Sequence, residues 1–304
     1  MINTFTLNPS VDCYLTIDRE PMVDEVNRGK NAIYKAGGKG LNVSKALSVL
    51  GIPSKAVALL GGFTGDFIRS ECEKDKNIGL IPIQVNGTNR INMKAHYGDR
   101  ALCINGDGPR ADEETKKKLF DVLDDLKESD TAVISGSMMP GFGEEDLIKM
   151  ADRIHEKGAE LVIDMEKISP DVLKQCKPDL IKPNLYELQL LMKDPSITKE
   201  NAESVLRKLK KEGIGSILLS LGRDGAILVD EEGLLHLDQP NTVLVNKVGA
   251  GDAMLAGFLG ILEKTRDREL ALRYAGAAGN ATASQMEDIS EETIMKFLPE
   301  MKTR

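Results

Sequence analysis

The chain has 304 residues, of which 41% are hydrophobic and 29% are charged, a composition typical of a soluble globular protein. Its 48 acidic residues outnumber the 40 basic ones and no long basic cluster occurs, so nucleic acid is not expected as a partner. No apolar stretch is long enough to span a membrane, and no signal-peptide pattern occurs. The 4 cysteines are scattered without metal-ligand spacing, and we expect a cytoplasmic location.

Strands and helices are predicted to alternate along most of the chain. A strand at 2–7 comes first, a helix follows the glycines of 36–42, and a strand at 55–60 precedes a helix that opens near Gly61. The later predicted elements are helix 111–127, strand 131–135, helix 144–157, strands 160–163 and 179–182, helix 198–211, strand 216–220, a hairpin of 226–229 and 234–237, and helices 251–263, 267–285 and 291–298. This order predicts an α/β fold with a mostly parallel central sheet and helices on both faces.

Two segments, 11–36 and about 86–107, interrupt this alternation. They show strand-like patterns without helical periodicity, and we expect them to pair as a small β lid on a single domain of 1–304. Ligands of parallel sheets bind at the carboxyl ends of the strands, so the glycine-rich turns are expected along one edge. These turns are Gly37-Gly38, Ser135-Gly136-Ser137, Ser220-Leu221-Gly222 and Gly249-Ala250-Gly251.

The stretch 246–252, followed by the apolar run 253–262, predicts a helix whose first amides are uncovered and can hold an anionic group. Asp252 lies in the first turn of that helix. A carboxylate there can accept the proton of a hydroxyl that attacks a phosphoryl group, and a helix cap is the structural alternative. The cations that could hold a substrate phosphate are Arg28, Lys39 and Arg90.

Other common catalytic patterns do not occur. The Gly37–Gly40 turn lacks the first glycine and the Ser or Thr of a Walker loop, and no dinucleotide fingerprint follows the first strand. The nucleophile elbow Gly-x-Ser-x-Gly is absent as well. The chain has only 3 histidines, so a hydrolytic triad or a metal site built from histidines is not favoured.

Six motifs occur in a characteristic order. They are Asn8-Pro9-Ser10-Val11-Asp12, Gly37-Gly38-Lys39-Gly40-Leu41-Asn42, Ser135-Gly136-Ser137-Met138-Met139-Pro140-Gly141, Lys182-Pro183-Asn184-x-x-Glu187, Ser220-Leu221-Gly222-x-x-Gly225 and Val248-Gly249-Ala250-Gly251-Asp252. Through them the chain resembles the PfkB (ribokinase-like) carbohydrate kinase family over nearly its whole length. The first motif, with 61–65 and 90–92, resembles the branch that acts on hexose monophosphates, which includes 1-phosphofructokinase, tagatose-6-phosphate kinase and a 6-phosphofructokinase.

The resemblance implies a role for each matching residue. The residues implied to hold the sugar are Asp12, Gly37, Gly38, Lys39 and Asn42, and those around its phosphate are Arg28, Lys39, Arg90 and Ser137. Asp252 is implied as the base, with Gly249, Ala250 and Gly251 forming the anion hole. On the nucleotide side the implied residues are Lys182, Asn184, Ser220, Gly222 and Gly225, with Glu187 near Mg²⁺.

The implied activity is ATP-dependent phosphorylation of the free primary hydroxyl of a ketohexose monophosphate. Fructose 1-phosphate, giving fructose 1,6-bisphosphate, is the favoured substrate, and tagatose 6-phosphate is the close alternative. The implied cofactor is Mg²⁺ with ATP, a monovalent cation is left open, and a homodimer through the lid is expected. A catalytically silent sugar-phosphate sensor and a nucleoside or adenosine kinase are the other hypotheses.

Three departures from the family pattern stand out. Leu102-Cys103-Ile104-Asn105 replaces the usual Thr-Glu-Ile-Asn, so a lid carboxylate is missing and the identity of the sugar is open. Lys247 stands where Ser or Thr is common, and Asp164-Met165-Glu166-Lys167 lacks the usual Asp-Thr-Ser/Glu-Gly. The last two bear on the nucleotide side, and none of the three changes Asp252.

Overall fold

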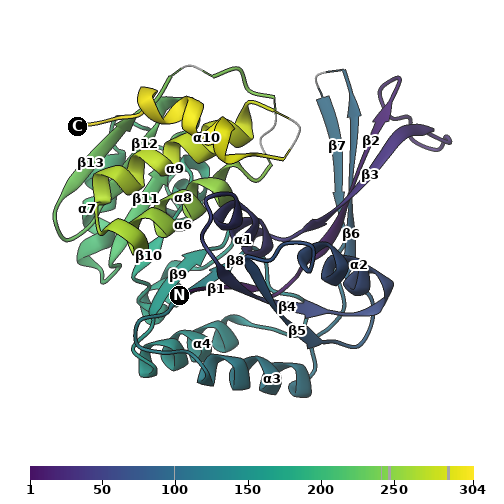
Figure 1. Cartoon of the computed structure of the whole chain (residues 1–304), viewed down its shortest axis with the longest axis horizontal. Helices are drawn as coiled ribbons and strands as arrows, with labels where there is room; N and C mark the ends of the chain where they lie inside the picture. The colour runs from purple at the N-terminus through teal and green to yellow at the C-terminus, as the bar shows by residue number, and fades with distance from the viewer. Residues whose placement is uncertain (99, 241, 246–247, 286–287) are drawn as a thin grey trace.

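A computed structural model of the chain describes residues 1–98, 100–240, 242–245, 248–285 and 288–304 (Figure 1). Lys247, one of the departures noted above, lies outside these residues. Within the described residues the strands form a large sheet in the body and a smaller sheet that projects from it (Figure 1). No helix among them combines the length and the apolar character that crossing a membrane requires.

The strands of the large sheet are, in spatial order, β14 (Lys302–Thr303), β13 (Leu234–Asp238), β12 (Ala226–Val229), β11 (Ser216–Ser220), β10 (Leu180–Ile181), β9 (Glu160–Asp164), β8 (Thr131–Ser135), β1 (Ile2–Thr6), β4 (Ser54–Leu60) and β5 (Ile78–Gln84). From β11 to β5 every neighbouring pair is parallel, whereas β12, β13 and β14 form an antiparallel edge. The predicted mostly parallel sheet is therefore confirmed.

Helices cover both faces of this sheet, as predicted (Figure 1). One layer contains α1 (Lys39–Val49), α2 (Gly62–Cys72), α8 (Ala250–Thr265), α9 (Arg268–Ala283) and α10 (Glu291–Phe297). The other contains α3 (Glu113–Asp124), α4 (Glu144–Glu156), α5 (Pro170–Cys176), α6 (Leu185–Met192) and α7 (Ala202–Lys211). Because side chains alternate along a strand, Ile2 and Val133 pack in the apolar cluster of α1, α8 and α9, and Phe5 and Ile134 pack in that of α3 to α7.

The structure corrects the sequence analysis at three helices. No helix is predicted at α5 or α6, because seven or eight residues are too few to show helical periodicity. Their starts do carry local signals, a Ser169 cap followed by Pro170 and a capping box of Asn184 with Glu187. The helix predicted from Thr198 begins at Ala202, since Thr198 donates its N–H to Asn201 and the preceding residues form a turn.

The smaller sheet consists of β3 (Gly29–Gly37), β2 (Ser10–Ile17), β6 (Arg90–Tyr97) and β7 (Arg100–Asn105), in that spatial order. These strands lie in the two segments that the sequence analysis assigned to a lid, and we call them the lid sheet. At its base Val11 and Ala36 pack against α1 and α2. Farther out, the same face is apolar and exposed, with Tyr34, Ile91, Met93, Leu102 and Ile104.

Candidate active site

The candidate site lies where strands β1, β8, β9 and β10 end and helices α1 and α8 begin. The strand order of the large sheet reverses at β1, since β4 and β5 follow on one side of it and β8 and β9 on the other. A crevice therefore opens beyond the carboxyl end of β1. Asp164 and Lys182 follow Val162 and Leu180 by two positions, which directs their side chains to the face covered by α1 and α8. Strand periodicity thus brings an acid and a base toward two helix N-termini.

Asp252 lies in the first turn of α8 and is 5% exposed. The helix is capped by Gly249, which adopts a left-handed conformation with φ of 82° and has no side chain, so Asp252 is not the capping residue. Asp252 Oδ2 accepts a hydrogen bond from Asn42 Nδ2 at 2.8 Å. Burial, reinforced by the charge of Asp164, raises the pKa of Asp252 to about 6. A carboxylate with a pKa near neutrality is suited to accept a proton.

Two lysines face the buried acid Asp164. Lys39 Nζ lies 3.4 Å from Asp164 Oδ1, 3.8 Å from Glu187 Oε1 and 4.0 Å from Glu166 Oε1. Burial alone would lower the pKa of Lys39, but the surrounding carboxylates raise it above its ordinary value. Lys182 Nζ lies 3.4 Å from Asp164 Oδ2 on the other side. The cluster therefore keeps the ammonium group of Lys39 charged near Asp252.

Several buried polar atoms without a hydrogen-bond partner lie in the same place. Of the eight such atoms in the described residues, four lie at or just beyond the carboxyl ends of β1, β8 and β9: Thr6 Oγ1, Asn8 Oδ1, Ser135 Oγ and Asp164 Oδ2. Such atoms normally find a partner in a folded protein, so their grouping indicates a place for a polar ligand.

A cavity of about 590 Å³ opens between these strand ends and the base of the lid sheet. Of the predicted sugar-side residues, it is lined by Gly38, Lys39, Arg90 and Ser137. Gly38 has φ of 127°, and a Cβ there would lie 2.5 Å from Thr6 Cγ2, so the close approach of the chain at this point requires glycine. Arg90 is held by donating Nε and Nη2 to the carbonyl oxygen of Asn8.

Four other predicted residues, Asp12, Arg28, Gly37 and Asn42, lie outside the lining of this cavity, and Asn42 contacts Asp252 instead. Asp12 is buried on β2, where its carboxyl group packs against Gly37 at the base of the lid sheet. Arg28 is exposed and directly precedes β3, and its neighbour Gly29 pairs with Ile17. Counted along β3 from Lys35, which pairs with Asp12, Arg28 lies about 20 Å away toward the tip. Within one chain, Arg28 is not brought together with the other predicted phosphate ligands.

A second cavity, of about 300 Å³, opens on the other side of the α8 N-terminus. It is lined by the predicted residues Asn184, Ser220, Gly222, Gly225, Ala250 and Gly251. Its far wall lies on α9, was not predicted from the sequence, and contains Ala275, Gly276, Gly279 and Asn280. Small residues three or four positions apart lie on the same side of a helix and leave space beside it. That spacing is the feature of the sequence from which this wall could have been predicted. A largely apolar cleft with a few polar groups suits a nucleotide base and ribose.

Lys182 approaches the α8 N-terminus closely. A Cβ built on Gly251 would lie 3.0 Å from Lys182 Nζ, so glycine leaves room for the ammonium group beside the first amides of α8. Lys182 itself is 5% exposed. Amides and an ammonium group converging on one point form a site for an anion that undergoes transfer.

Asn184 and Glu187 form a capping box at the start of α6, in which each side chain accepts a hydrogen bond from the backbone N–H of the other residue. Asn184 N–H donates to Glu187 Oε2 at 2.8 Å, and Glu187 N–H donates to Asn184 Oδ1 at 2.9 Å. Glu187 Oε1 remains directed toward Lys39. The described residues contain no group of three or more His, Cys, Asp or Glu that could hold a metal by itself. Glu187 and the nearby Asp164 Oδ2, which has an ion pair with Lys182 but no hydrogen bond, do fit Mg²⁺ that takes its other ligands from phosphates and water.

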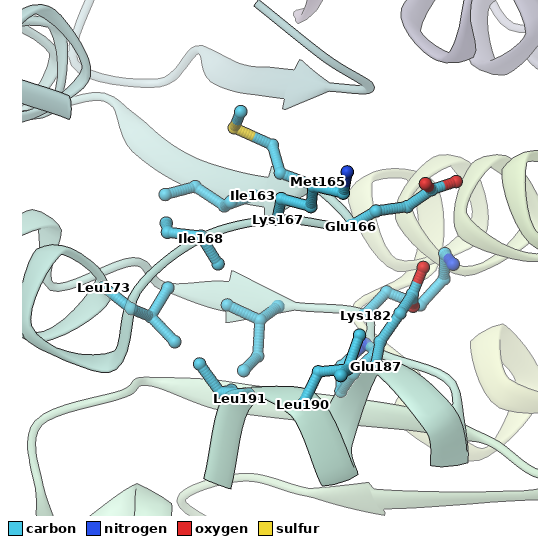
Figure 2. Close-up of a pocket in the computed structure, with 12 residues that line it drawn as sticks. Ile163, Met165, Glu166, Lys167, Ile168, Leu173, Lys182, Glu187, Leu190 and Leu191 are labelled. Atoms are coloured by element: carbon cyan, nitrogen blue, oxygen red, sulfur yellow. The ribbon is translucent and has the colours of Figure 1, made fainter. Parts of the chain in front are cut away.

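Figure 2 shows a third, smaller cavity of about 120 Å³ between the segment after β9 and helix α6. The side chains of Glu166, Lys182 and Glu187 lie at one end of it, and Leu173 lies at the other (Figure 2). Glu166 and Lys167 line both this cavity and the large one, so the segment 165–167 separates the two. The departure from the family pattern at 164–167 thus lies in this dividing wall, next to the acid–lysine cluster.

The raised pKa of Asp252 predicts the acid limb of the pH profile. If Asp252 is the base, kcat/KM falls about tenfold per pH unit below about 6, because only the ionised carboxylate accepts a proton. Activity is therefore present above pH 6 and lost as the pH falls through it. Substrate phosphates also titrate near pH 6, to about the same extent in every variant. The contribution of the substrate phosphates is measured from the pH profile of the residual activity of Asp252→Asn. A wild-type pH profile that is no steeper below pH 6 than the profile of this variant would contradict the prediction.

Comparison with known proteins agrees with this geometry. A model of the pfkB family carbohydrate kinase matches residues 6–294. The chain is 35% identical over 302 residues to 1-phosphofructokinase of Bacillus subtilis, with 99% of each sequence covered. It is 34% identical over 287 residues to D-tagatose-1-phosphate kinase of Bacillus licheniformis, covering 93% of this chain and 92% of that protein.

Phosphofructokinase-2 of Escherichia coli, solved in complex with substrates and products, has a similar fold, with a TM-score of 0.90, 24% identity and 98% of each chain covered. That similarity supports the ribokinase-like fold predicted from the sequence. The family match covers nearly the whole chain, and the two relatives, both named as sugar-phosphate kinases, align over at least 92% of each sequence. The chain belongs to the pfkB family of carbohydrate kinases.

Proposed function

We propose that this protein is an ATP-dependent kinase that phosphorylates the free primary hydroxyl of a ketohexose 1-phosphate, with fructose 1-phosphate as the substrate. The observation that carries the proposal is the position of Asp252 between two cavities. Its helix neighbours Ala250 and Gly251 line the smaller cavity, and Lys39, which neighbours Asp252 through the acid–lysine cluster, lines the larger one. Asp252 lines neither cavity itself, but it lies at the junction between the cavity proposed for the acceptor and the one proposed for the donor.

In the proposed reaction the sugar phosphate binds in the larger cavity, where Arg90, Lys39 and the turn of Ser137 surround its phosphate. ATP binds in the smaller cavity along Ser220, Gly222 and Gly225. Mg²⁺ near Glu187 supplies charge neutralisation for the ATP phosphates when bound. Asp252 accepts the proton of the attacking hydroxyl, and the amides of Ala250 and Gly251 stabilise the charge on the transferred group.

The two curated relatives support phosphate at carbon 1 of the bound sugar. Both are named for 1-phosphates, one of fructose and one of tagatose, at 35% and 34% identity. We therefore replace tagatose 6-phosphate by tagatose 1-phosphate as the second candidate. Fructose and tagatose differ only in the configuration of one hydroxyl, so a site that hydrogen-bonds that group separates them.

The test measures ADP release with fructose 1-phosphate, tagatose 1-phosphate, tagatose 6-phosphate, fructose 6-phosphate and fructose. We expect kcat/KM for fructose 1-phosphate to exceed each of the others by about tenfold or more. A preference for either 6-phosphate would overturn the proposed orientation of the sugar. Binding of a hexose phosphate without ADP release would support the silent sensor, and equal rates with fructose would favour an uncharged acceptor. Because ATP and hexose phosphates are cytoplasmic metabolites, the proposal also places the enzyme in the cytoplasm.

We further propose that the lid sheet closes over the sugar and joins two chains as a homodimer. Its exposed apolar face, with side chains such as Tyr34, Met93 and Ile104 at 42–56% exposure, is the support for this interface. In a dimer, Arg28 at the lid tip of one chain could act at the sugar cavity of the other. We expect light scattering to give twice the 33.2 kDa of one chain, and Met93→Asp to give the single mass.

Mixing two inactive variants tests whether Arg28 acts across the dimer. A heterodimer of Asp252→Asn and Arg28→Met chains contains one site with an intact Asp252, which receives Arg28 from the other chain. If Arg28 acts in this way, the mixture regains activity that neither homodimer has. If Arg28 acts within its own chain, mixing restores nothing, and if Arg28 does not act at all, the Arg28→Met homodimer is already as active as the wild type.

A further inference from the structure

We propose that Lys94 is a positioning residue for the sugar, because it clamps and neutralises the carboxylate of Asp12. This inference deepens the proposed function and rests on it. Lys94 belongs to none of the motifs that the sequence analysis singled out. It lies on β6 of the lid sheet, two positions beyond Asn92, which is the β6 partner of Asp12 on β2, so Lys94 and Asn92 lie on the same face.

The contacts of Asp12 are made by three side chains of the lid sheet. Lys94 Nζ donates to Asp12 Oδ2 at 2.6 Å. Ser10 Oγ and Asn92 Nδ2 donate to Asp12 Oδ1 at 2.8 and 2.9 Å. Lys94 and Asp12 are 9% and 8% exposed, so the ion pair is shielded from water. The carboxylate is thus held in one orientation at the base of the lid sheet, above Gly37.

Lys94 is itself held from the other side. Its Nζ donates to the hydroxyl oxygen of Tyr14 at 3.0 Å and lies 4.7 Å from the centre of the Tyr14 ring. Burial would lower the pKa of Lys94, but the hydrogen bond and charge of Asp12 raise it, so the ammonium group stays charged. Tyr14 in turn stacks on His96, with ring centres 6.3 Å apart. This arrangement leaves Lys94 directed at Asp12.

The other cations near Asp12 are bound elsewhere. Lys35 pairs with Asp12 in the strand register, but its Nζ donates to Asp288 Oδ1 at 2.8 Å. Arg90 donates its Nε and Nη2 groups to Asn8. Cys103, which stands opposite Lys94 on β7 at the place of the missing lid carboxylate, offers no negative charge. Among the described residues, Asp12 is therefore the only acid with which Lys94 forms an ion pair.

This neutralisation matters because the substrate is an anion. Asp12 lies close to Arg90: burial lowers the pKa of Arg90, and the charge of Asp12 opposes that effect. Arg90 lines the cavity proposed for the sugar phosphate. A bare carboxylate there would repel the phosphate, and a freely rotating one would not hold a sugar hydroxyl in place. With Lys94 in place and the lid sheet closed over the sugar as proposed above, Asp12 can accept hydrogen bonds from the sugar without adding net negative charge.

The test replaces Lys94 by Met and measures KM for fructose 1-phosphate, KM for ATP, and kcat. We expect KM for the sugar phosphate to rise about 10–100-fold, and KM for ATP and kcat to stay within about threefold. The matched control is Lys30→Met in the same sheet, where Lys30 pairs with the exposed Asp18 at 2.7 Å, and it should leave all three values unchanged. Lys94→Arg, which keeps the charge, should recover most of the affinity for the sugar.

The variant that removes both charges keeps the test interpretable if Lys94→Met folds poorly. Asp12→Asn with Lys94→Met contains no unpaired buried charge, and its KM for the sugar phosphate should equal that of Asp12→Asn alone. An unchanged KM in folded Lys94→Met, or an equal rise of KM for ATP, would overturn the inference. Failure of the wild-type enzyme to phosphorylate any hexose phosphate would instead refute the proposed function.

Discussion

Replacing Asp252 by Asn is expected to lower kcat about 10²–10⁴-fold while both KM values change little, because loss of a general base affects mainly the transition state. Asn has the shape of Asp and can still accept the hydrogen bond that Asn42 donates at 2.8 Å. The acid–lysine cluster around it stays in place. The readout is single-turnover phosphoryl transfer at saturating substrates, which separates chemistry from product release.

The same substitution is expected to stabilise the fold at neutral pH. A pKa of about 6 against the ordinary 3.8 means that folding disfavours ionised Asp252, by roughly 3 kcal/mol when the group is fully charged. Since the folded pKa of this acid is raised, the cost is complete above pH 6 and disappears below the ordinary pKa. Asp252→Asn should therefore raise Tm at pH 7–8 and leave it unchanged near pH 4.

The matched control for both effects is Asp238→Asn, which changes an exposed carboxylate that pairs with Arg304 at 2.9 Å. It should alter neither kcat nor the pH dependence of Tm. Near-normal kcat in folded Asp252→Asn would exclude this residue as the base. A lower Tm of Asp252→Asn than of the wild type at pH 7 would show that ionised Asp252 stabilises the fold, and would contradict the expected cost of its burial.

Replacing Lys182 by Met is expected to lower kcat about 10²–10³-fold, the effect of removing one preorganised donor to a developing charge. The ammonium group lies beside Gly251 at the α8 N-terminus, and it is 5% exposed, so its charge acts with little screening. Unlike an exposed lysine, it contacts the place where the transferred phosphoryl group is proposed to lie.

A second effect follows from the charge of Lys182. Lys182 and Lys39 both lower the pKa of Asp252 against the larger effect of burial. Losing Lys182 should therefore raise that pKa and move the acid limb of the kcat/KM profile to higher pH. Gly251→Ala offers a graded comparison, because its Cβ would lie 3.0 Å from Lys182 Nζ and would push the ammonium group aside without removing it.

Lys174→Met is the control, since Lys174 pairs with Glu212 at 3.0 Å on the outside of the body. It should match the wild type in kcat and in the pH profile. If Lys182→Met changed KM for ATP but not kcat, the residue would bind the nucleotide without stabilising the transfer. An unshifted acid limb would contradict the electrostatic link between Lys182 and Asp252.

Much of the architecture could be predicted because it depends on local patterns. Alternation of strands and helices predicts the parallel sheet with two helix layers, and the glycine-rich run before Asp252 predicts a helix N-terminus with open amides. The short helices α5 and α6 were missed, because two turns of helix show no clear periodicity even when their caps are present. Some lining residues of both cavities were named in advance, but the α9 wall and Gln239 of the smaller cavity and the segment 105–107 of the larger one were not.

The sequence by itself determined the elements and the chemistry at the start of α8, because helix propensity, capping and free amides arise within a few neighbouring residues. Only the tertiary structure decided that Asp164 lies between Lys39 and Lys182, that Lys94 pairs with Asp12, and that Arg28 lies far from the cavity of its own chain. These outcomes depend on strand order and register, which set side chains distant in sequence on the same face of a sheet. No local pattern encodes that pairing.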